Sequence, residues 1–276
     1  MNLTFFARPS FLGNLYPKHF SKPYRMRLGP QIRGKDVADY IGAKFNPTEG
    51  FEHDLIIYVK PRRLNRVRDD DWVDVSDGEW LVDLLAERPN IKVIVHTQSC
   101  HDYLRDKIKN RIVVIPQQHL NWENAKRTKR KFNTGGYIGS PSPTALNMYG
   151  EIGKRLSEIG LKFITCFDYQ KREDAVNFYK KIDFLVVGDW KDKSPYKTAT
   201  RMINAASFGI PSIAYPLIGY KDFEGYYIHA NNNDEILVEA EKLKNKETYN
   251  IWSKKIVKEA EKYHISNITK LYTKLR

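Results

Sequence analysis

The chain has 276 residues, enough for one large core or two smaller ones, and its content of 41% hydrophobic and 13% aromatic residues is that of an ordinary soluble globular protein. No apolar run approaches the roughly 18 residues that a bilayer-spanning helix needs, so the sequence excludes a membrane-spanning protein. The net charge of +13 predicts an anionic partner, such as a phosphate-bearing small molecule, a nucleic acid or a membrane surface.

The N-terminal segment, "MNLTFFARPSFLGNLYP", lacks the basic stretch and apolar core of a secretion signal. We therefore expect a first β-strand there and a cytoplasmic protein. The chain contains only two cysteines, Cys100 and Cys166, and no Cys/His cluster at metal-binding spacing. This cysteine usage predicts a reducing compartment and no structural metal.

The first half of the chain alternates short apolar runs with amphipathic segments. The apolar runs are typical of buried parallel strands and lie near residue 3 and at 54–59, 72–75, 92–96 and 111–116. Between them, residues 78–88 and 99–109 have the spacing of amphipathic helices. The alternation predicts an α/β domain with a parallel sheet.

Residues 121–131, "NWENAKRTKRK", are polar and basic without apolar periodicity, so we place a domain boundary at residue 131. The strand and helix pattern then restarts. Strands are predicted at 135–140, 162–167, 183–188 and 211–216, and helices at 144–159, 171–181 and 198–208. From residue 233 onward the pattern is helical. The predicted domains are therefore 1–131, 132–250 and a helical tail, 251–276.

The stretch "SPYKTATRMINAASFGIPSIAYP" follows a predicted buried strand and a polar loop. It places Lys197, Thr200 and Arg201 in the predicted first turn of a helix. Lys197 and Arg201 are four residues apart, so they would share one helix face and, with the helix dipole, hold a diphosphate. The alternative is that these are solvated surface charges.

The same stretch resembles the donor domain of retaining nucleotide-sugar glycosyltransferases with the two-domain GT-B fold. Their pattern K-S-x-x-R-x-x-x-A-x-x-x-G-x-P-x-x-A is matched here by Lys197, Thr198, Arg201, Ala205, Gly209, Pro211 and Ala214. Residues 135–143, "GGYIGSPSP", resemble the first strand and phosphate-facing loop of that domain. The resemblance implies two Rossmann-like doubly wound domains facing across a cleft, with C-terminal helices returning to the first domain, and a nucleoside-diphosphate sugar as co-substrate, most simply a UDP-sugar.

The resemblance also implies roles for single residues. Lys197 and Arg201 would neutralise the leaving diphosphate without a metal ion. Four more residues would lie near the donor phosphate or nucleotide: Thr200, Gly139, Ser140 and Ser142. Tyr196 and Asn204 stand where many relatives carry the two glutamates of an E-x7-E motif that binds ribose hydroxyls, and neither is a glutamate here. The absence of both glutamates puts the ribose contact and the exact family in doubt. It does not affect the predicted binding of the diphosphate by Lys197 and Arg201.

Three residues of the first domain are further candidates. His96 ends a predicted strand and would donate a hydrogen bond to a sugar hydroxyl, and Asp77 would orient or deprotonate an acceptor. Gly13, after the first strand, would let the backbone approach the sugar. For each the alternative is a purely structural role. The acidic run 69–71, "DDD", lies among four arginines and is interpreted as a charged surface loop and not as a metal site.

The acceptor is predicted from charge. Basic residues alternate with aromatic ones near the N-terminus, as nucleic-acid grooves require. The predicted contacts there are Lys22, Arg25, Arg27 and Arg33, and Arg62 and Arg63 follow later in the chain. One hypothesis is a resemblance to phage enzymes that glycosylate hydroxymethylated DNA bases, which would act in the host cytoplasm. A second is a transferase acting on a cell-surface glycan or lipid-linked acceptor at an anionic membrane.

Two further hypotheses have no transfer step to an acceptor. The charge and the missing glutamates would also suit a nucleic-acid-binding protein on a degenerate transferase scaffold. A sugar-nucleotide 2-epimerase shares the two-domain layout, but no histidine and carboxylate pair accompanies the predicted cations. No obligate protein partner is evident from the sequence.

Overall fold

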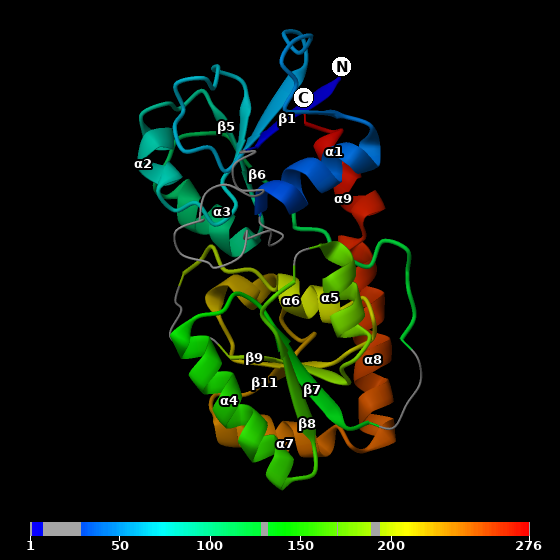
Figure 1. The fold of residues 1–276 in the computed structure, drawn as a ribbon. Helices are drawn as coiled ribbons and strands as arrows, with labels where there is room; N and C mark the ends of the chain where they lie inside the picture. The colour runs from blue at the N-terminus through cyan, green and yellow to red at the C-terminus, as the bar shows by residue number, and fades with distance from the viewer. Residues whose placement is uncertain (1, 8–28, 128–131, 170, 189–193, 276) are drawn as a thin grey trace. The chain divides into compact units, whose positions relative to one another are not determined.

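The computed structural model describes residues 2–7, 29–127, 132–169, 171–188 and 194–275, and Figure 1 shows the course of the chain. The chain divides into two compact units. Unit 1 comprises Met1–Gln118, Ser194–Thr198 and Ile265–Arg276, and unit 2 comprises His119–Lys193 and Ala199–His264. Each unit is built on its own sheet. None of the described helices has the length and apolar character needed to cross a membrane.

The sheet of unit 1 has the strand order β2-β1-β3-β4-β5-β6, and all neighbouring strands are parallel. Its strands are β1 (Leu3–Ala7), β2 (Lys44–Phe45), β3 (Leu55–Val59), β4 (Trp72–Asp74), β5 (Lys92–Val95) and β6 (Ile112–Val114). The register places Phe6 opposite Tyr58 and Val59 opposite Asp74. The carboxyl ends of all six strands therefore lie at one edge of this sheet.

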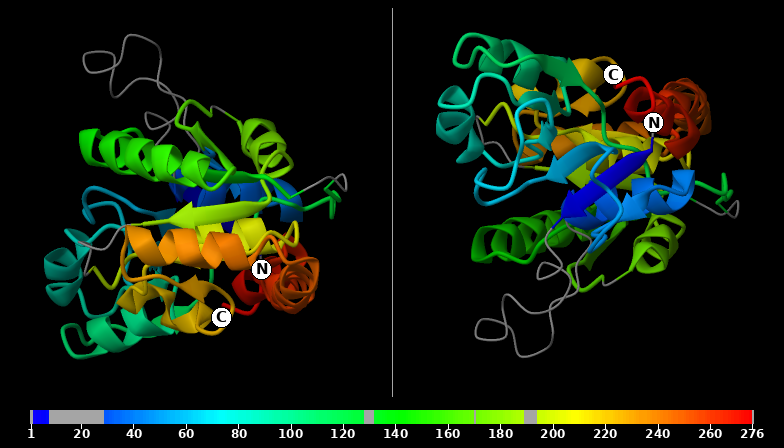
Figure 2. Two further views of the ribbon diagram at one scale, coloured as in Figure 1. Left: turned by 90° about the horizontal axis from the view of Figure 1, so that it is seen from below. Right: turned by 90° about the horizontal axis from the view of Figure 1, so that it is seen from above.

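Helices cover the two faces of this sheet unequally. The helix α1 (Asp36–Ile41), its π-helical extension η2 (Pro30–Lys35) and the C-terminal α9 (Ile265–Tyr272) pack on one face, where Phe5, Ile57 and Tyr272 are buried together. Figure 2 (right) shows β1 in blue with α1 and the red α9. On the other face α2 (Leu81–Ala86) and α3 (Gln98–Arg105) bury Val73 and Val93.

The sheet of unit 2 has the order β11-β10-β9-β7-β8 and is also parallel throughout. Its strands are β7 (Thr134–Ile138), β8 (Lys162–Cys166), β9 (Phe184–Val187), β10 (Ser212–Ala214) and β11 (Ile228–His229). From β7 the chain first forms β8 on one side and then crosses to β9 on the other. The point between β7 and β9 is thus the place where the strand order reverses.

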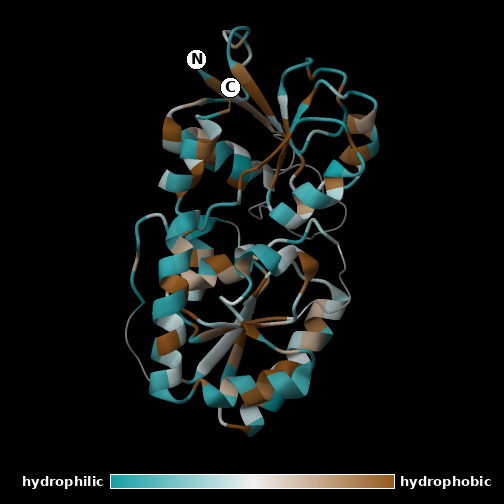
Figure 3. Cartoon of the chain, turned by 180° about the vertical axis from the view of Figure 1, so that it is seen from behind, coloured by the Kyte–Doolittle hydropathy of each residue, from teal (hydrophilic) through white to brown (hydrophobic). Residues whose placement is uncertain are grey.

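Both faces of the second sheet are covered by helices. On one face lie α4 (Pro143–Glu158) and α7 (Asn233–Lys242), and on the other α5 (Arg172–Tyr179), α6 (Thr200–Ala206) and α8 (Lys246–Ala260), which is seen nearly end-on in Figure 2. Figure 3 shows hydrophobic residues in the strands of each unit and alternating colours along the helices. Two 3-10 turns, η3 (Ile218–Phe223) and η4 (Glu261–Tyr263), complete unit 2.

The predicted fold class, parallel-sheet α/β units, is confirmed. The turn after α6 contains Gly209 in the left-handed region, at φ 68°, and a Cβ there would lie 2.6 Å from the Ser253 Oγ, so glycine is required at this predicted helix stop. Two boundaries differ from expectation. Helix α3 is capped by Thr97, whose Oγ1 accepts from the Cys100 N–H at 3.1 Å, and α6 begins at Thr200.

Candidate functional site

The strand order of unit 2 reverses between β7 and β9, and this point is a candidate ligand site. In open parallel α/β sheets, ligands bind outside the carboxyl ends of the strands at the point where the order reverses. Here that point lies after β7 and β9. Tyr149 of α4 joins the two strand ends, because its ring stacks on Tyr137 with centroids 3.6 Å apart, and its hydroxyl donates to the Gly188 carbonyl (3.1 Å) and accepts from the Gly188 N–H (3.0 Å).

Arg201 lies at this point. Its guanidinium stands over the Tyr137 ring, 5.2 Å from the ring centroid. In the described part of the chain no carboxylate forms an ion pair with this guanidinium, although the side chain is partly buried. The Tyr179 hydroxyl donates to the Arg201 backbone carbonyl at 3.2 Å and holds this turn of α6. A partly buried cation without a counter-ion is a site for an anion.

Gly139 brings the backbone next to this cation. A Cβ at Gly139 would lie 2.3 Å from the Tyr137 hydroxyl and 3.0 Å from an Arg201 Nη atom. The Gly139 N–H donates to the Cys166 carbonyl at 3.1 Å, so the loop after β7 is held in place. The structure thus brings together Gly139 and Arg201, two residues that the sequence predicted for one site.

The serines of the same loop lie at the start of α4. Ser142 is the N-cap of this helix, and its Oγ accepts from the Ala145 N–H at 3.1 Å. Ser140 is exposed. A helix N-terminus offers unpaired N–H groups and the positive end of the helix dipole to an anion. Thr200 is the first residue of α6. The roles of Thr200, Ser140 and Ser142 near a donor phosphate stay predictions.

The predicted pairing of Lys197 with Arg201 on one helix face is wrong. Because α6 begins at Thr200, Lys197 lies in the segment before it, where its N–H donates to the Ser194 carbonyl at 3.3 Å. Lys197 belongs to unit 1 and Arg201 to unit 2. The sequence spacing of four residues therefore does not translate into a shared helical face.

The two residues at the positions of the E-x7-E glutamates have structural contacts. Asn204 lies in α6, and its Oδ1 accepts from the Leu120 N–H at 2.9 Å. Tyr196 is buried in unit 1, with its ring edge-on to Tyr103 at 5.9 Å, and burial raises the pKa of its hydroxyl. These contacts place Asn204 and Tyr196 in the supporting structure of different units.

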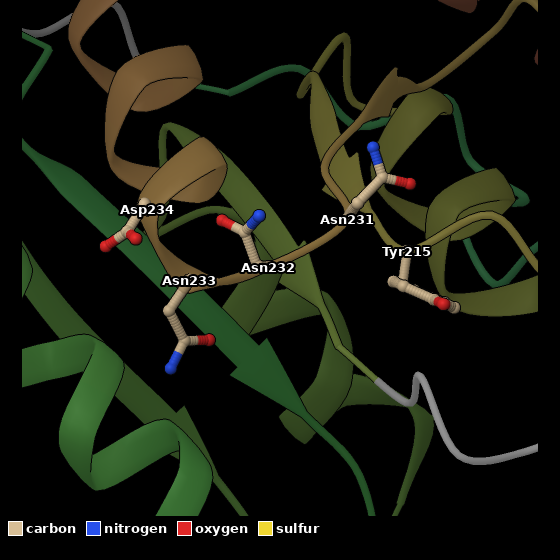
Figure 4. Close-up of a pocket in the computed structure, with 5 residues that line it drawn as sticks. All are labelled: Tyr215, Asn231, Asn232, Asn233 and Asp234. Carbon is tan, nitrogen blue, oxygen red and sulfur yellow. The ribbon is translucent and has the colours of Figure 1, made fainter.

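A polar pocket that the sequence analysis did not predict lies at the carboxyl ends of β10 and β11 in unit 2. It has a volume of about 430 Å³ and is lined by Tyr215, Asn231, Asn232, Asn233 and Asp234, which Figure 4 shows. Asn232 caps α7, and Asn233 donates to a Glu151 carboxylate oxygen at 3.2 Å. The buried Oδ1 of Asn233 has no hydrogen-bond partner within the described part of the chain. Amides and a hydroxyl suit the hydroxyl groups of a sugar or ribose. The signal was available, since three consecutive asparagines, 231–233, follow the short strand β11 after a single alanine.

In unit 1 the two predicted acid–base residues follow β4 and β5. His96 is buried, and its Nε2 lies 3.9 Å from the Asp74 carboxylate and has no hydrogen-bond partner among the residues that the structure describes. Burial, with the positive charges of Arg33 and Lys60, holds the pKa of His96 well below its ordinary value, so the ring is neutral at pH 7. Asp77 is exposed and forms an ion pair of 2.5 Å with Lys60.

The backbone at this edge of unit 1 is unusual. Three non-glycine residues that follow strands directly or closely have left-handed φ angles, namely Asn46 (48°), Lys60 (50°) and Ser76 (53°). Such conformations cost of order 1–3 kcal/mol each and cluster at functional sites. They point to this edge of the unit 1 sheet as the functional edge.

The predicted basic track has one clear correction. Arg33 is completely buried, its Nε donating to the Asp74 carboxylate at 2.6 Å and an Nη to the Ile115 carbonyl at 3.0 Å, so it is part of the core and not of a surface track. Arg62 and Arg63 are exposed and line a groove in unit 1. Four other predicted residues lie outside the described residues: Gly13, Lys22, Arg25 and Arg27.

Asp69 and Asp70 of the acidic run 69–71 lie on the surface, as predicted, whereas Asp71 is buried. Asp69 pairs with Arg88 at 2.7 Å, Asp71 with Arg68 at 3.0 Å, and Asp70 with Lys92 at 3.3 Å. Over the whole described range, no group of three or more His, Cys, Asp or Glu side chains is placed to hold a metal ion.

The chain has no detectable match among family models, and no curated protein matches it in sequence. Solved structures do match in fold. A glycosyltransferase from Rickettsia africae superposes with a TM-score of 0.64 at 9% identity, over 99% of this chain and 97% of that one. HepE from Anabaena, solved in complex with UDP and glucose, gives 0.62 at 10% identity, over 99% and 98%.

TarM of S. aureus, solved in complex with Fondaparinux, alpha-GlcNAc-glycerol and UDP, gives a TM-score of 0.59 at 16% identity. The match covers 80% of this chain but only 55% of the TarM chain, so this chain spans about half the length of that protein. At these identities the matches establish the fold. The two parallel-sheet α/β units are those of GT-B glycosyltransferase structures.

Proposed function

We propose that this protein is a glycosyltransferase that moves a sugar from a nucleoside-diphosphate donor to an acceptor hydroxyl. The observation that carries the proposal is the Arg201 guanidinium. It lies at the strand-order reversal of unit 2, beside Gly139, and has no carboxylate partner among the described residues. A diphosphate would supply the missing negative charge.

The polar pocket after β10 and β11 supports a sugar nucleotide over a simple phosphate. Its amide side chains, those of Asn231, Asn232 and Asn233, and the Tyr215 side chain lie in the same unit and at the same sheet edge as Arg201. HepE and TarM were solved with UDP, which supports UDP as the nucleotide here. In this proposal the pocket binds hydroxyl groups of the donor and Arg201 binds its diphosphate.

The chemistry requires stabilisation of a leaving group. When the bond from the sugar to the diphosphate breaks, negative charge builds on the departing phosphate oxygen, and a fixed cation lowers the barrier by several kcal/mol. Arg201 would supply this charge. In a retaining reaction, which we propose for a hexose donor, the departing phosphate oxygen can receive the acceptor's proton. No metal is required in this scheme.

The acceptor we propose is a hydroxyl of a glycan. Asp77 and the neutral His96 stay candidates for orienting that hydroxyl, because both follow strands at the functional edge of unit 1. A hydroxymethylated base in DNA is the competing acceptor, and it loses one of its predicted contacts because Arg33 lies in the core. The reaction is proposed to take place in the cytoplasm, where nucleotide sugars are made.

Isothermal titration with UDP-, GDP-, ADP- and CMP-sugars tests the donor site. We expect one nucleotide sugar to bind and Arg201→Gln to weaken its binding by roughly 10- to 100-fold, since a hydrogen bond to a charged group contributes about 1.5–3 kcal/mol. Lys254→Gln removes one positive charge from the exposed surface of α8 and is the matched control, with unchanged affinity expected.

Two results would contradict the proposal. Equal losses in both variants would mean that net charge, and not the Arg201 site, sets the affinity. Binding of plain DNA with no binding, hydrolysis or transfer of any nucleotide sugar would favour a nucleic-acid-binding protein on a transferase scaffold.

A further inference from the structure

Two connections in the sheet of unit 1 are unusual because they carry no helix. Parallel sheets normally carry helices on both faces. Here the connections from β2 to β3, residues 46–54, and from β3 to β4, residues 60–71, contain no helix. Phe5 and Ile57 point to the face covered by α1 and α9, so the alternate residues Phe6 and Tyr58 belong to the opposite face, where Tyr58 also packs against the apolar cluster that α2 and α3 form. Among the described residues, both connections contribute to the lining around Phe6 and Tyr58.

A groove of about 890 Å³ lies on this face. Its floor is aromatic, because the Phe6 ring stacks on Tyr58 with centroids 5.4 Å apart and meets the Phe51 ring edge-on at 5.0 Å. The Tyr58 hydroxyl donates to the Arg66 carbonyl at 3.0 Å and so fixes the 60–71 connection as one wall. The groove is therefore a built feature of unit 1.

The rim of the groove is positively charged. It carries Arg62, Arg63 and Arg66, all exposed, and no acidic residue is among the described lining residues. Within the described chain these three guanidinium groups form no ion pair. The neighbouring carboxylates are occupied, since Asp71 pairs with Arg68 and Asp69 with Arg88. Three arginines in five residues thus face solvent without counter-ions.

We infer that this groove binds an acidic glycan, a hydroxyl-rich chain that carries phosphate or similar anionic groups. The guanidinium fork matches phosphate oxygens, and neutral groups on the walls, from Thr48 and Asn65, suit hydroxyls. The rings of the floor pack on one another instead of presenting a row of open faces, which is unfavourable for stacking nucleobases. The inference rests on the proposed function for its biological meaning, because the glycan would be the acceptor chain.

Binding of a short poly(glycerol phosphate), measured by fluorescence anisotropy without any nucleotide sugar, tests the groove independently of the donor site. We expect salt-sensitive binding. Replacing all three arginines (Arg62→Gln, Arg63→Gln and Arg66→Gln) should weaken it by about tenfold or more, as three exposed charge contacts would predict. The matched control removes three exposed charges around the end of α3, with Arg105→Gln, Lys107→Gln and Lys109→Gln, and should change affinity by less than about twofold.

Other outcomes overturn the inference in distinct ways. Equal losses in the two triple variants would show that net charge and not the groove is responsible. Tighter, arginine-dependent binding of oligothymidylate would identify a nucleic acid as the ligand, and arginine-dependent binding only to phosphatidylglycerol vesicles would identify a lipid surface. If poly(glycerol phosphate) binds as expected while no nucleotide sugar binds, the groove stands and the proposed transferase activity fails.

Discussion

Two arginines of this chain differ in what neutralises them. Arg33 is buried against Asp74, and the Tyr272 hydroxyl lies 3.4 Å from the same carboxylate. The positive charge of Arg33 is therefore neutralised inside unit 1. Arg201 is held by the Tyr137 ring without an acidic partner in the described chain. A buried pair serves structure, whereas a cation held over an aromatic ring keeps its capacity for an anion. This difference supports the proposed donor site at Arg201.

The close approach at Gly139 gives a prediction at the scale of one methyl group. In Gly139→Ala the new Cβ meets the Tyr137 hydroxyl and the Arg201 guanidinium, so one of them must move. We expect a loss of stability of about 1–3 kcal/mol, as in overpacked cores, and weaker binding of the nucleotide sugar. Urea denaturation and isothermal titration measure the two effects.

Gly150→Ala is the matched control for this change. Gly150 lies in α4, and a Cβ there would meet nothing within 4 Å. Alanine in a helix interior should stabilise the protein by about 0.5–1 kcal/mol and leave donor affinity unchanged. Donor affinity that survives Gly139→Ala intact would argue against a phosphate site beside Gly139.

At the scale of elements, the segment between β6 and β7 joins unit 2 through a buried histidine. The His119 N–H donates to the Tyr263 carbonyl at 2.9 Å, and the His119 ring lies edge-on to His264 at 5.3 Å. The His119 Nδ1 accepts from the Asn121 N–H, so this nitrogen carries no proton and the ring is neutral. Burial, together with His264, lowers the pKa of His119 to about 4.

This pKa predicts acid sensitivity. Because the folded pKa is below the unfolded value of 6.5, the unfolded state binds more protons between these values, and stability falls as the pH drops through that window. His119 alone would contribute up to about 3 kcal/mol of this loss, and His96 adds to it in the same direction. His119→Asn should flatten the slope of unfolding free energy against pH by up to about 1.4 kcal/mol per pH unit.

Urea denaturation at several pH values between 4 and 7 measures this slope. His53→Gln, at an exposed position in the connection from β2 to β3, is the control and should leave the slope unchanged. A slope that is the same in wild type and His119→Asn would mean that His119 is protonated in the folded protein and that the prediction is wrong.

The elements themselves were largely predictable where apolar periodicity is strong. Residues 54–59, 72–75 and 92–96 form β3, β4 and β5 within a residue or two, and the 144–159 helix is α4. The segment 30–41 was missed as a helix, because its polar residues include Arg33 and Asp36, whose burial depends on distant parts of the chain. Local pattern cannot reveal a partner such as Asp74, 41 residues away.

The candidate site was predicted in part for the same reason. Gly139 and Arg201 were found because a close approach and a cation at a strand-end loop have local signals. Lys197 was misplaced because the start of α6 at Thr200 has no side-chain cap that the sequence could show. The polar pocket of 231–234 was overlooked because asparagines after a strand also occur in ordinary turns, and Asn232 is indeed a helix cap.

At the scale of the whole molecule, unit 1 depends on residues far apart in sequence. Ile268 and Tyr272 of α9 are buried with Phe5 and Val37, so the C-terminal helix supplies part of the core under β1. We expect Ile268→Ala to destabilise the protein by about 2–5 kcal/mol, through loss of buried contacts and the cavity left behind. Ile251→Ala, at a position 62% exposed on α8, should change stability by less than about 0.5 kcal/mol.

Hydrogen exchange distinguishes the two units in this experiment. Faster exchange in β1 and α1 of Ile268→Ala, with β7 and β9 unchanged, is the expected pattern. Uniformly faster exchange in both units would show that they unfold together and would contradict an independent contribution of α9 to unit 1.

The division of the chain also sets an order of events during synthesis. Unit 2 is complete once His264 has left the ribosome, whereas unit 1, which starts first, still lacks residues 265–276. The core of unit 1 therefore stays incomplete while unit 2 can already fold. This order is contrary to the usual one, in which the N-terminal domain folds first. A nascent chain stalled in this interval would expose the apolar residues that α9 covers, and it is the species that chaperones would be expected to bind.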